Sequence, residues 1–217
     1  MNVIELRNYL LKPGLRDKFV DYFNDHFIQS QNALGAFTPG QYRVKDEDDR
    51  FFWIRGFDNM EKRSRFLPAF YGGKTWKIFG PAANEMMLEW HDVHLLRPAG
   101  AGIGEFVKKQ ELMVIDFYTA ANNKFDQLTN LFVKTYIPLF HSWGINNISL
   151  WISELAENDF PQLPVYQQND LLVVITGYTN EAGYELTVKQ INSTGQKVVN
   201  KIKELAISNK RLLLYPA

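Results

Sequence analysis

Two short segments of the chain combine ionisable and aromatic side chains at alternate positions. The first holds Glu5, Arg7 and Tyr9, and the second holds Trp53 and Arg55. Arginine presents a planar set of N–H donors that fits a carboxylate, and aromatic rings form an apolar wall for a flat molecule. These residue types predict a site for a small molecule that carries a carboxylate or an aromatic ring.

A third segment adds Glu89 and His91 to this set. Histidine titrates near neutral pH, so His91 is a candidate for moving a proton. The candidate site residues share one face of an expected sheet and are Glu5, Arg7, Tyr9, Trp53, Arg55, Phe57, Glu89 and His91. The same charges can instead pair internally, Glu5 with Arg55 or Glu89 with Arg7, and fix the register of two packed sheets. Both interpretations stay open, and no catalytic residue is assigned.

Regular spacing of apolar residues predicts the elements that position these side chains. Strands are expected in the first half at 3–11, 37–45, 50–58 and 88–97. One helix starts at Leu15, where apolar residues recur every four positions through Phe27. A second helical stretch covers about 60–87, with breaks around Pro68–Gly73 and at Gly80-Pro81. The face with Trp53 is too aromatic for a solvated surface, so we expect it to pack on another sheet and enclose a cavity.

The chain repeats this order of elements. The segment 54–59 (IRGFDN) has an echo in 175–180 (ITGYTN), and 156–168, with Pro161 and Pro164, is expected to be an inserted loop. Strands are expected at 111–119, 146–154, 170–178 and 210–215, with helices near 124–140 and 180–206. The predicted domains are a first repeat, 1–98, a linker, 99–105, and a second repeat, 106–217.

The predicted fold class is therefore α+β. Two tandem ferredoxin-like (βαββαβ) repeats would pack their antiparallel sheets as a dimeric-type α/β barrel, with the candidate residues in the lumen of the first repeat. Eight of the nine arginines fall in the first half and Arg211 alone in the second, which also points to the first half as the place for a ligand.

Several segments resemble the NIPSNAP family. They are 4–14 (IELRNYLLKPG), 52–58 (FWIRGFD), Trp76 and 95–98 (LLRP). The similarity covers the first half and extends more loosely to the second, where Asp116 replaces Arg7 and Thr176 replaces Arg55. The resemblance implies a dimeric α/β-barrel fold and carries over no catalytic motif. The wider superfamily includes cofactor-free monooxygenases, small-lactone isomerases and haem-dependent enzymes, so fold alone does not give function.

Composition excludes several classes of protein. The chain has 24 Lys plus Arg, 24 Asp plus Glu and no cysteine. The balanced charge argues against a nucleic-acid partner, and the absence of cysteine excludes disulfides, thiolate metal sites and thiol nucleophiles. No apolar run reaches the ~20 residues of a spanning helix, and Glu5 and Arg7 argue against a signal peptide. We therefore expect a soluble, cytoplasmic protein; a homodimer is one possible assembly, and the sequence leaves the choice between monomer and dimer open.

The sequence also argues against metals and cofactors. His91 and His94 are three residues apart on one strand and point to opposite faces, so they cannot bind one ion together. The glycines at 100–104 fit a linker rather than a nucleotide loop, and the run 46–49 (DEDD) fits a hairpin turn rather than a calcium loop. No cofactor and no metal are predicted.

The prediction for function is binding of a small aromatic or carboxylate-bearing molecule in the lumen of the first repeat. One alternative is a structural or interaction protein whose barrel is filled by its own side chains. A pocket well below ~300 Å³ would favour that alternative. A further alternative is a cofactor-free monooxygenase or isomerase, and whether the chain is an enzyme stays open.

Overall fold

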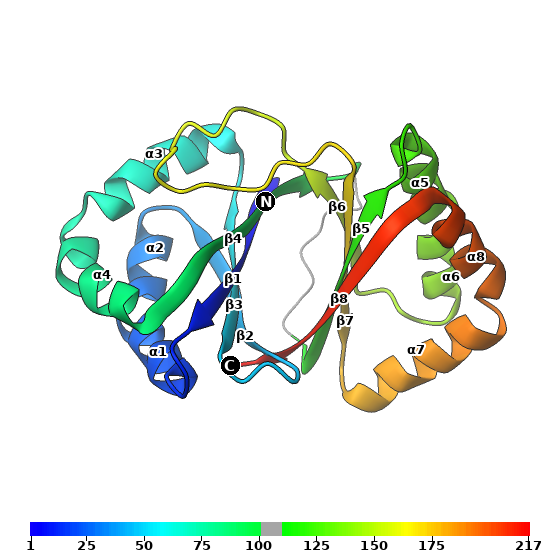
Figure 1. The fold of residues 1–217 in the computed structure, drawn as a ribbon, viewed down its shortest axis with the longest axis horizontal. Coiled ribbons are helices and arrows are strands. Elements are labelled where there is room, and N and C mark those ends of the chain that lie inside the picture. The colour runs from blue at the N-terminus through cyan, green and yellow to red at the C-terminus, as the bar shows by residue number, and fades with distance from the viewer. Residues whose placement is uncertain (101–109) are drawn as a thin grey trace. The chain divides into compact units, whose positions relative to one another are not determined.

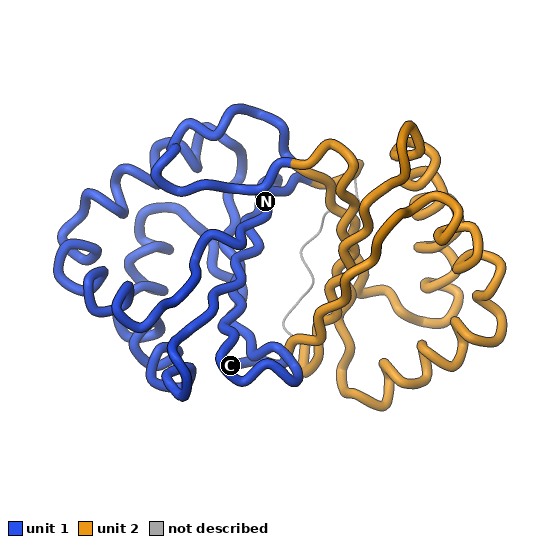
Figure 2. Tube along the Cα trace, viewed as in Figure 1, with its two compact units in different colours: residues 1–97, 154–167, 215–217 blue, residues 98–153, 168–214 orange. Residues whose placement is uncertain are grey.

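A computed structural model describes residues 1–100 and 110–217 (Figure 1). These residues divide into two compact units, which are treated separately below. Unit 1 contains 1–97, 154–167 and 215–217, and unit 2 contains 98–153 and 168–214 (Figure 2). Most of the predicted linker, 101–105, lies outside the described residues. The predicted domain boundaries therefore stay a prediction.

Unit 1 is built from one antiparallel sheet and four α-helices. Its strands pair in the order β4-β1-β3-β2. The strands are β1 (Val3–Leu11), β2 (Phe37–Val44), β3 (Arg50–Phe57) and β4 (Met87–Pro98), the last residue of which belongs to unit 2. The helices are α1 (Arg16–Phe23), α2 (Gln29–Ala33), α3 (Met60–Tyr71) and α4 (Lys74–Met86). A π-helical stretch, Asn24–Ile28, joins α1 to α2.

Local sequence explains the helices of unit 1. Phe19, Phe23 and Phe27 are buried on one face, as their four-residue spacing predicts. The helix α2 ends at Ala33, and the chain turns at Gly35, whose φ of +91° suits glycine. The predicted break around Pro68–Gly73 is confirmed, because α3 ends at Tyr71 and α4 begins at Lys74. The predicted break at Gly80-Pro81 is wrong, because α4 continues to Met86. Pro81 removes only one hydrogen-bond donor, and burial of the residues that follow it sustains the helix.

Unit 2 repeats the element order and the strand order of unit 1. Its antiparallel sheet has the order β8-β5-β7-β6. The strands are β5 (Leu112–Ala120), β6 (Ile148–Ser153), β7 (Leu171–Tyr178) and β8 (Ala206–Pro216). The helices are α5 (Phe125–Leu131), α6 (Ile137–Ser142), α7 (Glu181–Ser193) and α8 (Gln196–Leu205), with a π-helical stretch at Phe132–Tyr136. The chain is thus α+β with antiparallel sheets, as predicted.

Each unit has its core between the sheet and the helices that cover one of its faces. In unit 1, helix residues such as Phe19, Phe23 and Phe70 pack against Phe51 and Trp53 of β3. In unit 2 the corresponding layer contains the residues Tyr118, Phe132, Tyr136, Phe140, Leu172 and Val174. Residues on the helix-covered face of each sheet are therefore enclosed within their own unit.

The segment 154–167 follows β6 in the chain but packs within unit 1. It contains no helix or strand, as the predicted inserted loop requires, and lies alongside α3 (Figure 1). Backbone hydrogen bonds tie its ends to β4: Glu154 N donates to Leu95 O at 2.9 Å, and Tyr166 N donates to Val93 O at 2.7 Å. Unit 1 therefore contains a surface segment from the second half of the sequence.

Candidate functional site

Glu5, near the middle of β1, is fully buried and binds three arginines. Its Oε2 accepts hydrogen bonds from Arg55 Nη2 at 2.6 Å, Arg55 Nε at 2.9 Å and Arg7 Nη1 at 2.8 Å. Its Oε1 accepts one from Arg63 Nε at 2.8 Å. Arg7 lies on β1 together with Glu5, Arg55 lies on the neighbouring strand β3, and Arg63 lies on α3. Both oxygens of the carboxylate are used by the protein itself.

The charge of this buried group is unbalanced. Glu5, Arg7, Arg55 and Arg63 are each at most 1% exposed. Since arginine stays protonated in proteins, the group carries 3 − 1 = +2 charges. Burial alone raises the pKa of Glu5, but the positive charges of Arg55, Arg7 and Arg63 outweigh burial and hold that pKa well below its ordinary value. Buried charge without a counter-charge is costly, so this group favours a further anion.

The remaining donors of the arginines meet mostly neutral acceptors. Arg55 Nη1 donates to Gln31 Oε1 at 3.1 Å, and Arg7 Nε donates to Tyr9 Oη at 2.8 Å. Arg63 Nη1 donates to Asn158 Oδ1 at 3.0 Å and lies 3.6 Å from Asp159 Oδ1. Because the Asp159 side chain is 42% exposed, solvent screens much of its charge. The excess positive charge is therefore only partly offset.

Aromatic rings surround the Arg55 guanidinium. Its Cζ lies 5.2 Å from the ring centroid of Phe66, 5.3 Å from that of Trp53 and 6.0 Å from that of Tyr71. Ring faces attract cations, which helps to hold a buried guanidinium. Trp53 is 3% exposed, and its Nε1–H has no hydrogen-bond partner among the described residues. This N–H is a buried donor available to an acceptor on a ligand.

A small cavity of about 30 Å³ adjoins Arg55 between the sheet and the helices of unit 1. We call it the arginine cavity. Its lining is Tyr9, Gln31, Trp53, Arg55, Tyr71 and Trp76, together with apolar side chains, chiefly phenylalanines of the helices. A space of this size holds about two water molecules. A ligand larger than about two water molecules requires part of the wall to move.

The predicted site residues of β1 and β3 lie together on one face of the sheet, but helices rather than a second sheet cover that face. Glu5 pairs with Arg55, and Arg7 pairs with Trp53, so their side chains share a face as predicted. That face is covered by the helices of unit 1, where Tyr9, Trp53 and Phe57 belong to the core. The prediction that it packs on another sheet and lines a barrel lumen is therefore wrong. Alternation shows which residues share a face and leaves open what covers it.

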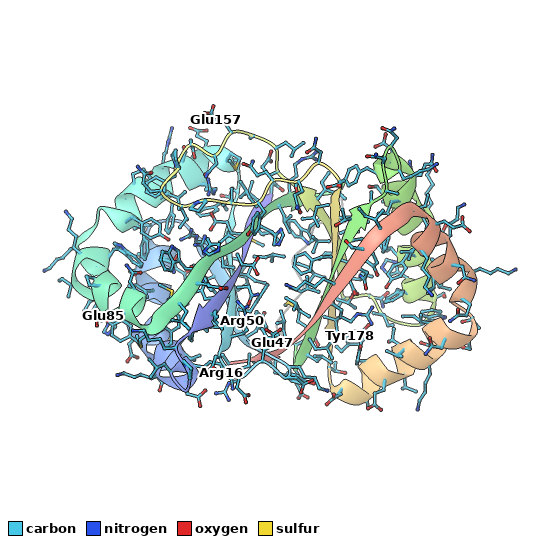
Figure 3. The ribbon with its side chains drawn as sticks, in the orientation of Figure 1. Arg16, Glu47, Arg50, Glu85, Glu157 and Tyr178 are labelled. Carbon is cyan, nitrogen blue, oxygen red and sulfur yellow. The ribbon has the colours of Figure 1, made fainter. Side chains whose placement is uncertain are left out.

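Glu89 and His91 do not join the buried cluster, which consists of Glu5, the three arginines that bind it and Gln31. The pairing of β1 with β4 slips twice, so that Asn8 faces Asp92 but Leu10 faces Glu89. A one-residue slip turns side chains to the opposite face. His91 is exposed, and Glu89 Oε2 lies 3.6 Å from Arg50 Nη1 rather than beside Arg7. Arg50 also bonds Glu47 in the hairpin turn (Figure 3). Of the two internal pairs considered, Glu5 with Arg55 is confirmed and Glu89 with Arg7 is wrong.

Two residues of the cluster were missed by the sequence analysis. Gln31 stands four residues after Phe27 and continues its apolar face, so a polar residue at that position was the available signal. Arg63 stands three residues before Phe66 and seven before Phe70, again on the apolar face of its helix. A polar side chain within an apolar stripe signals a buried partner. Asn158 gives no comparable signal.

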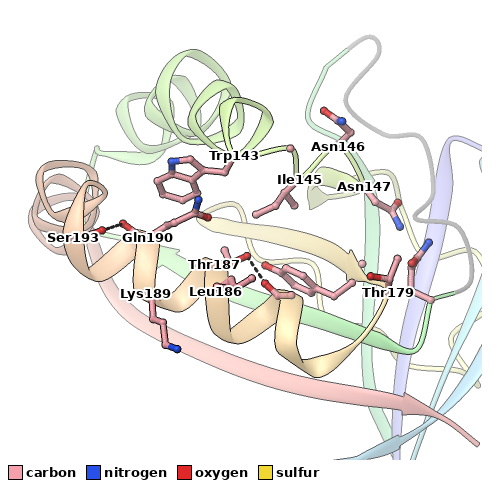
Figure 4. A pocket seen from close by; sticks show the side chains of 15 residues that line it. Trp143, Ile145, Asn146, Asn147, Thr179, Leu186, Thr187, Lys189, Gln190 and Ser193 are labelled. Carbon is pink, nitrogen blue, oxygen red and sulfur yellow. Dashed lines mark hydrogen bonds between the residues drawn. The ribbon is translucent and has the colours of Figure 1, made fainter.

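A larger and more open pocket of about 730 Å³ lies in unit 2, beside α7 (Figure 4). Its lining includes Trp143, Asn147, Leu186 and Gln190. Of the described residues that line it, Lys189 alone is charged. The pocket holds no buried ionisable group comparable with Glu5, and we assign it no ligand.

The described residues contain no candidate metal site and no candidate membrane span. There, no group of three or more His, Cys, Asp and Glu side chains could hold a metal ion. Within 1–100 and 110–217, no helix is long and apolar enough to cross a membrane.

Comparisons with known proteins show the fold. No family model matches the chain, and no curated protein matches it. A proposed monooxygenase from Lactobacillus acidophilus is 13% identical, with 99% of this chain and 93% of that chain covered and a TM-score of 0.68. Another, from Fusobacterium nucleatum, is 9% identical, with 99% and 91% covered and a TM-score of 0.70. The chain shares their fold. At such identities the likeness concerns the fold alone.

A NIPSNAP family protein from Agrobacterium tumefaciens also matches, over 48% of this chain and 100% of that chain. It is 16% identical, with a TM-score of 0.43. This chain is thus also similar to a NIPSNAP family protein over about half of its length, while the fold is shown by the full-length matches.

Proposed function

We propose that unit 1 binds a small molecule with a carboxylate or an aromatic ring in the arginine cavity. One observation carries the proposal: three buried arginines share the single carboxylate of Glu5, which leaves two positive charges in excess. An anion in the cavity would offset part of this charge at short range, where the low dielectric makes the attraction strong.

The lining also supports an aromatic acid as the ligand class. A carboxylate near Arg55 would accept a charge-assisted hydrogen bond, and the free N–H of Trp53 offers a second donor. The phenylalanines, Tyr71 and Trp76 supply apolar surface for a flat ring. Benzoate is the simplest probe with both features, and benzamide is its uncharged counterpart.

The proposal is tested by thermal denaturation and calorimetric titration with benzoate and benzamide. We expect benzoate to stabilise the wild type and benzamide to have little effect. Arg55→Met keeps an apolar side chain of similar length and should weaken benzoate binding by about ten- to a hundredfold, because it removes a charged donor. Trp53→Phe, which removes only the indole N–H and part of a ring, should weaken it less. Equal responses to benzoate and benzamide would contradict the proposal.

A second candidate is a structural or interaction protein whose interior is filled by its own side chains. The small size of the cavity, about 30 Å³, favours it, as does the complete pairing of the Glu5 carboxylate. This candidate predicts no stabilisation by any aromatic acid and no loss of stability when such acids are removed by dialysis.

The finer description of the fold is also a proposal. We infer two tandem ferredoxin-like repeats, supported by the shared element order and strand order of the two units. Packing of their sheets as a dimeric-type α/β barrel rests on the family resemblance. A homodimer, a cytoplasmic location, the lack of a nucleic-acid partner and oxygenase or isomerase chemistry stay predictions. Light scattering after size exclusion tests the homodimer.

A further inference from the structure

We infer that the segment Glu154–Gln167 is a movable cover over the Tyr71 side of the arginine cavity, with Phe160 limiting the size of the ligand through Tyr71 and Asn158 positioning Arg63. This inference rests on the proposed function, because it names what controls access to the same site. The segment comes from the second half of the sequence, so the second half would complete the site of the first.

The ends and one side of this segment are fixed to unit 1. In addition to the two backbone bonds to β4 described above, Leu95 N donates to Tyr166 O at 3.3 Å. Leu163 is buried in the core of unit 1, where the partly buried Phe160 packs against the same cluster. Glu157 lies at the outer edge of the segment (Figure 3). The attachment at the ends, together with an irregular centre, allows the centre to shift without releasing the whole segment.

The centre of the segment contacts the charged cluster through Asn158. Asn158 Oδ1 accepts a hydrogen bond from Arg63 Nη1 at 3.0 Å, while its Nδ2 donates to Leu163 O at 3.0 Å. Arg63 in turn donates to Glu5, which binds Arg55 at the cavity. A continuous chain of hydrogen bonds therefore joins the segment to the cation that faces the ligand. Asn158 acts on the ligand through Arg63, as a positioning residue.

Phe160 contacts the rim of the cavity. Its ring stacks on that of Tyr71, with centroids 5.7 Å apart and planes 19° from parallel. Tyr71 lines the cavity and lies edge-on to Trp76, another lining residue, at 4.8 Å. Tyr71 and Trp76 are only partly buried, whereas Phe19, Phe27 and Trp53 on the inner walls are at most 3% exposed. The rim that Phe160 supports is the part of the wall nearest to solvent.

The size of the cavity makes a movable wall necessary. The 30 Å³ space is too small for an aromatic ring, so a ligand such as benzoate enters only if the wall yields. The inner walls are close-packed core and resist displacement. Releasing the Phe160–Tyr71 stack breaks one aromatic pair, a small cost compared with opening the core. Tyr71 is thus the part of the wall that yields, and the segment that covers it controls the movement.

A ligand-free experiment tests whether Phe160 closes the rim. Acrylamide quenching of tryptophan fluorescence is compared in the wild type, Phe160→Ala and a matched control, Leu155→Ala, which truncates a 54% exposed residue of the same segment. We expect Phe160→Ala alone to raise quenching, and the rise to disappear in a Trp76→Phe background. Phe160→Leu serves if Phe160→Ala does not fold. Quenching that rises no more than in Leu155→Ala overturns the inference.

A ligand experiment tests selection by size. Titrations with benzoate and 2-naphthoate are compared in the wild type, Phe160→Ala and Asn158→Ala. Phe160→Ala should reduce the ratio of benzoate affinity to 2-naphthoate affinity by about three- to tenfold, which corresponds to the energy of one aromatic pair. Asn158→Ala should weaken both ligands without changing their ratio. A ratio unchanged by Phe160→Ala overturns the inference although the proposed function stands. If neither acid binds any variant, the proposed function fails, and the quenching result still decides the role of the segment.

Discussion

Units 1 and 2 have the same order of strands and helices, but they bury different side chains between the sheet and the helices. Glu5 and Arg7 lie on β1 of unit 1. The corresponding residues on β5 of unit 2, 109 positions later (116 − 7), are Val114 and Asp116. Arg55 of unit 1 corresponds to Thr176, 121 residues later (176 − 55). Each charged position of the cluster in unit 1 is thus neutral or opposite in charge in unit 2.

Unit 2 balances its buried charge with one pair. Arg211 Nε donates to Asp116 Oδ1 at 2.7 Å, and Arg211 Nη2 donates to Asp116 Oδ2 at 3.0 Å. The Arg211 side chain is 33% exposed, so water shares its solvation. Phe140, 2% exposed, stands where unit 1 has Gln31. Unit 2 therefore fills this layer with aromatic rings and a neutral pair.

This difference shows that two units with the same order of elements can differ in whether their buried charges favour a ligand. A balanced bidentate pair is satisfied by the protein alone, whereas three buried arginines around one carboxylate leave positive charge that Asp159 offsets only in part. The functional interpretation of unit 1 depends on this imbalance rather than on the fold.

The largest expected effect comes from neutralising Glu5. Glu5→Gln leaves Arg7 and Arg55 without a counter-charge and Arg63 with only the distant, partly exposed Asp159, and should lower the free energy of unfolding by about 3–5 kcal/mol. Asp116→Asn in unit 2 should cost about 1–2 kcal/mol, because Arg211 is partly solvated. Urea denaturation followed by circular dichroism measures both. If Asp116→Asn costs as much as Glu5→Gln, the contrast between the units is wrong.

Acid should act on unit 1 through the same carboxylate. The pKa of Glu5 is lowered in the folded state, since the attraction of its three arginines exceeds the effect of burial. A carboxyl with a lowered folded pKa contributes stability that is present above its ordinary value of 4.5 and is lost as the pH falls below it. Melting temperatures from pH 6 down to about pH 3 should therefore fall less steeply in Glu5→Gln than in the wild type. Parallel profiles would contradict this role for Glu5.

A smaller effect is expected from Gln31, the amide that accepts from Arg55. Gln31→Leu leaves Arg55 Nη1 without its partner and should cost about 1–2 kcal/mol, and bound benzoate should recover part of this loss. Phe140→Leu at the corresponding position of unit 2 should cost about 1 kcal/mol through packing, with no recovery by benzoate. Chemical denaturation with and without benzoate compares the two. Recovery of both variants, or of neither, removes the distinction between the units.

The smallest effects are expected from the two residues that the bulged pairing of β4 turns away from the cluster. Glu89→Gln loses only a surface contact with Arg50, and His91→Ala removes an exposed side chain, so each should change stability by less than about 0.5 kcal/mol. Benzoate affinity should be unchanged in both. A severalfold loss of affinity in either variant would show that the register argument misplaces these residues.

Much of the fold and part of the site followed from the sequence. Alternation in β1 and β3 placed Glu5, Arg7, Trp53 and Arg55 on one face, because a strand has a side-chain period of two. The four-residue spacing of Phe19, Phe23 and Phe27 gave the first helix. These are local patterns, and neighbouring residues are sufficient to determine them.

Three features depended on contacts that local patterns do not encode. The helices, rather than a second sheet, cover the charged face, and this is decided by tertiary packing. The slips in the pairing of β1 with β4 turn the Glu89 side chain to the opposite face of the sheet, and no residue type within β4 predicts these slips. Asn158 reaches Arg63 across 95 residues of sequence, at a position with no periodicity. The aromatic and charged composition nevertheless pointed to the half of the chain that contains the buried arginines.

The central claim is that the excess positive charge of unit 1 holds an anion beside Arg55. Anomalous diffraction from crystals grown with bromide tests it most directly, because a single halide ion is about the size of the cavity. The account predicts an anomalous peak within hydrogen-bond distance of Arg55 and Trp53 Nε1, absent in Arg55→Met crystals, and none at the Asp116–Arg211 pair. A cavity without bromide in the wild type, or a peak that persists in Arg55→Met, would contradict it.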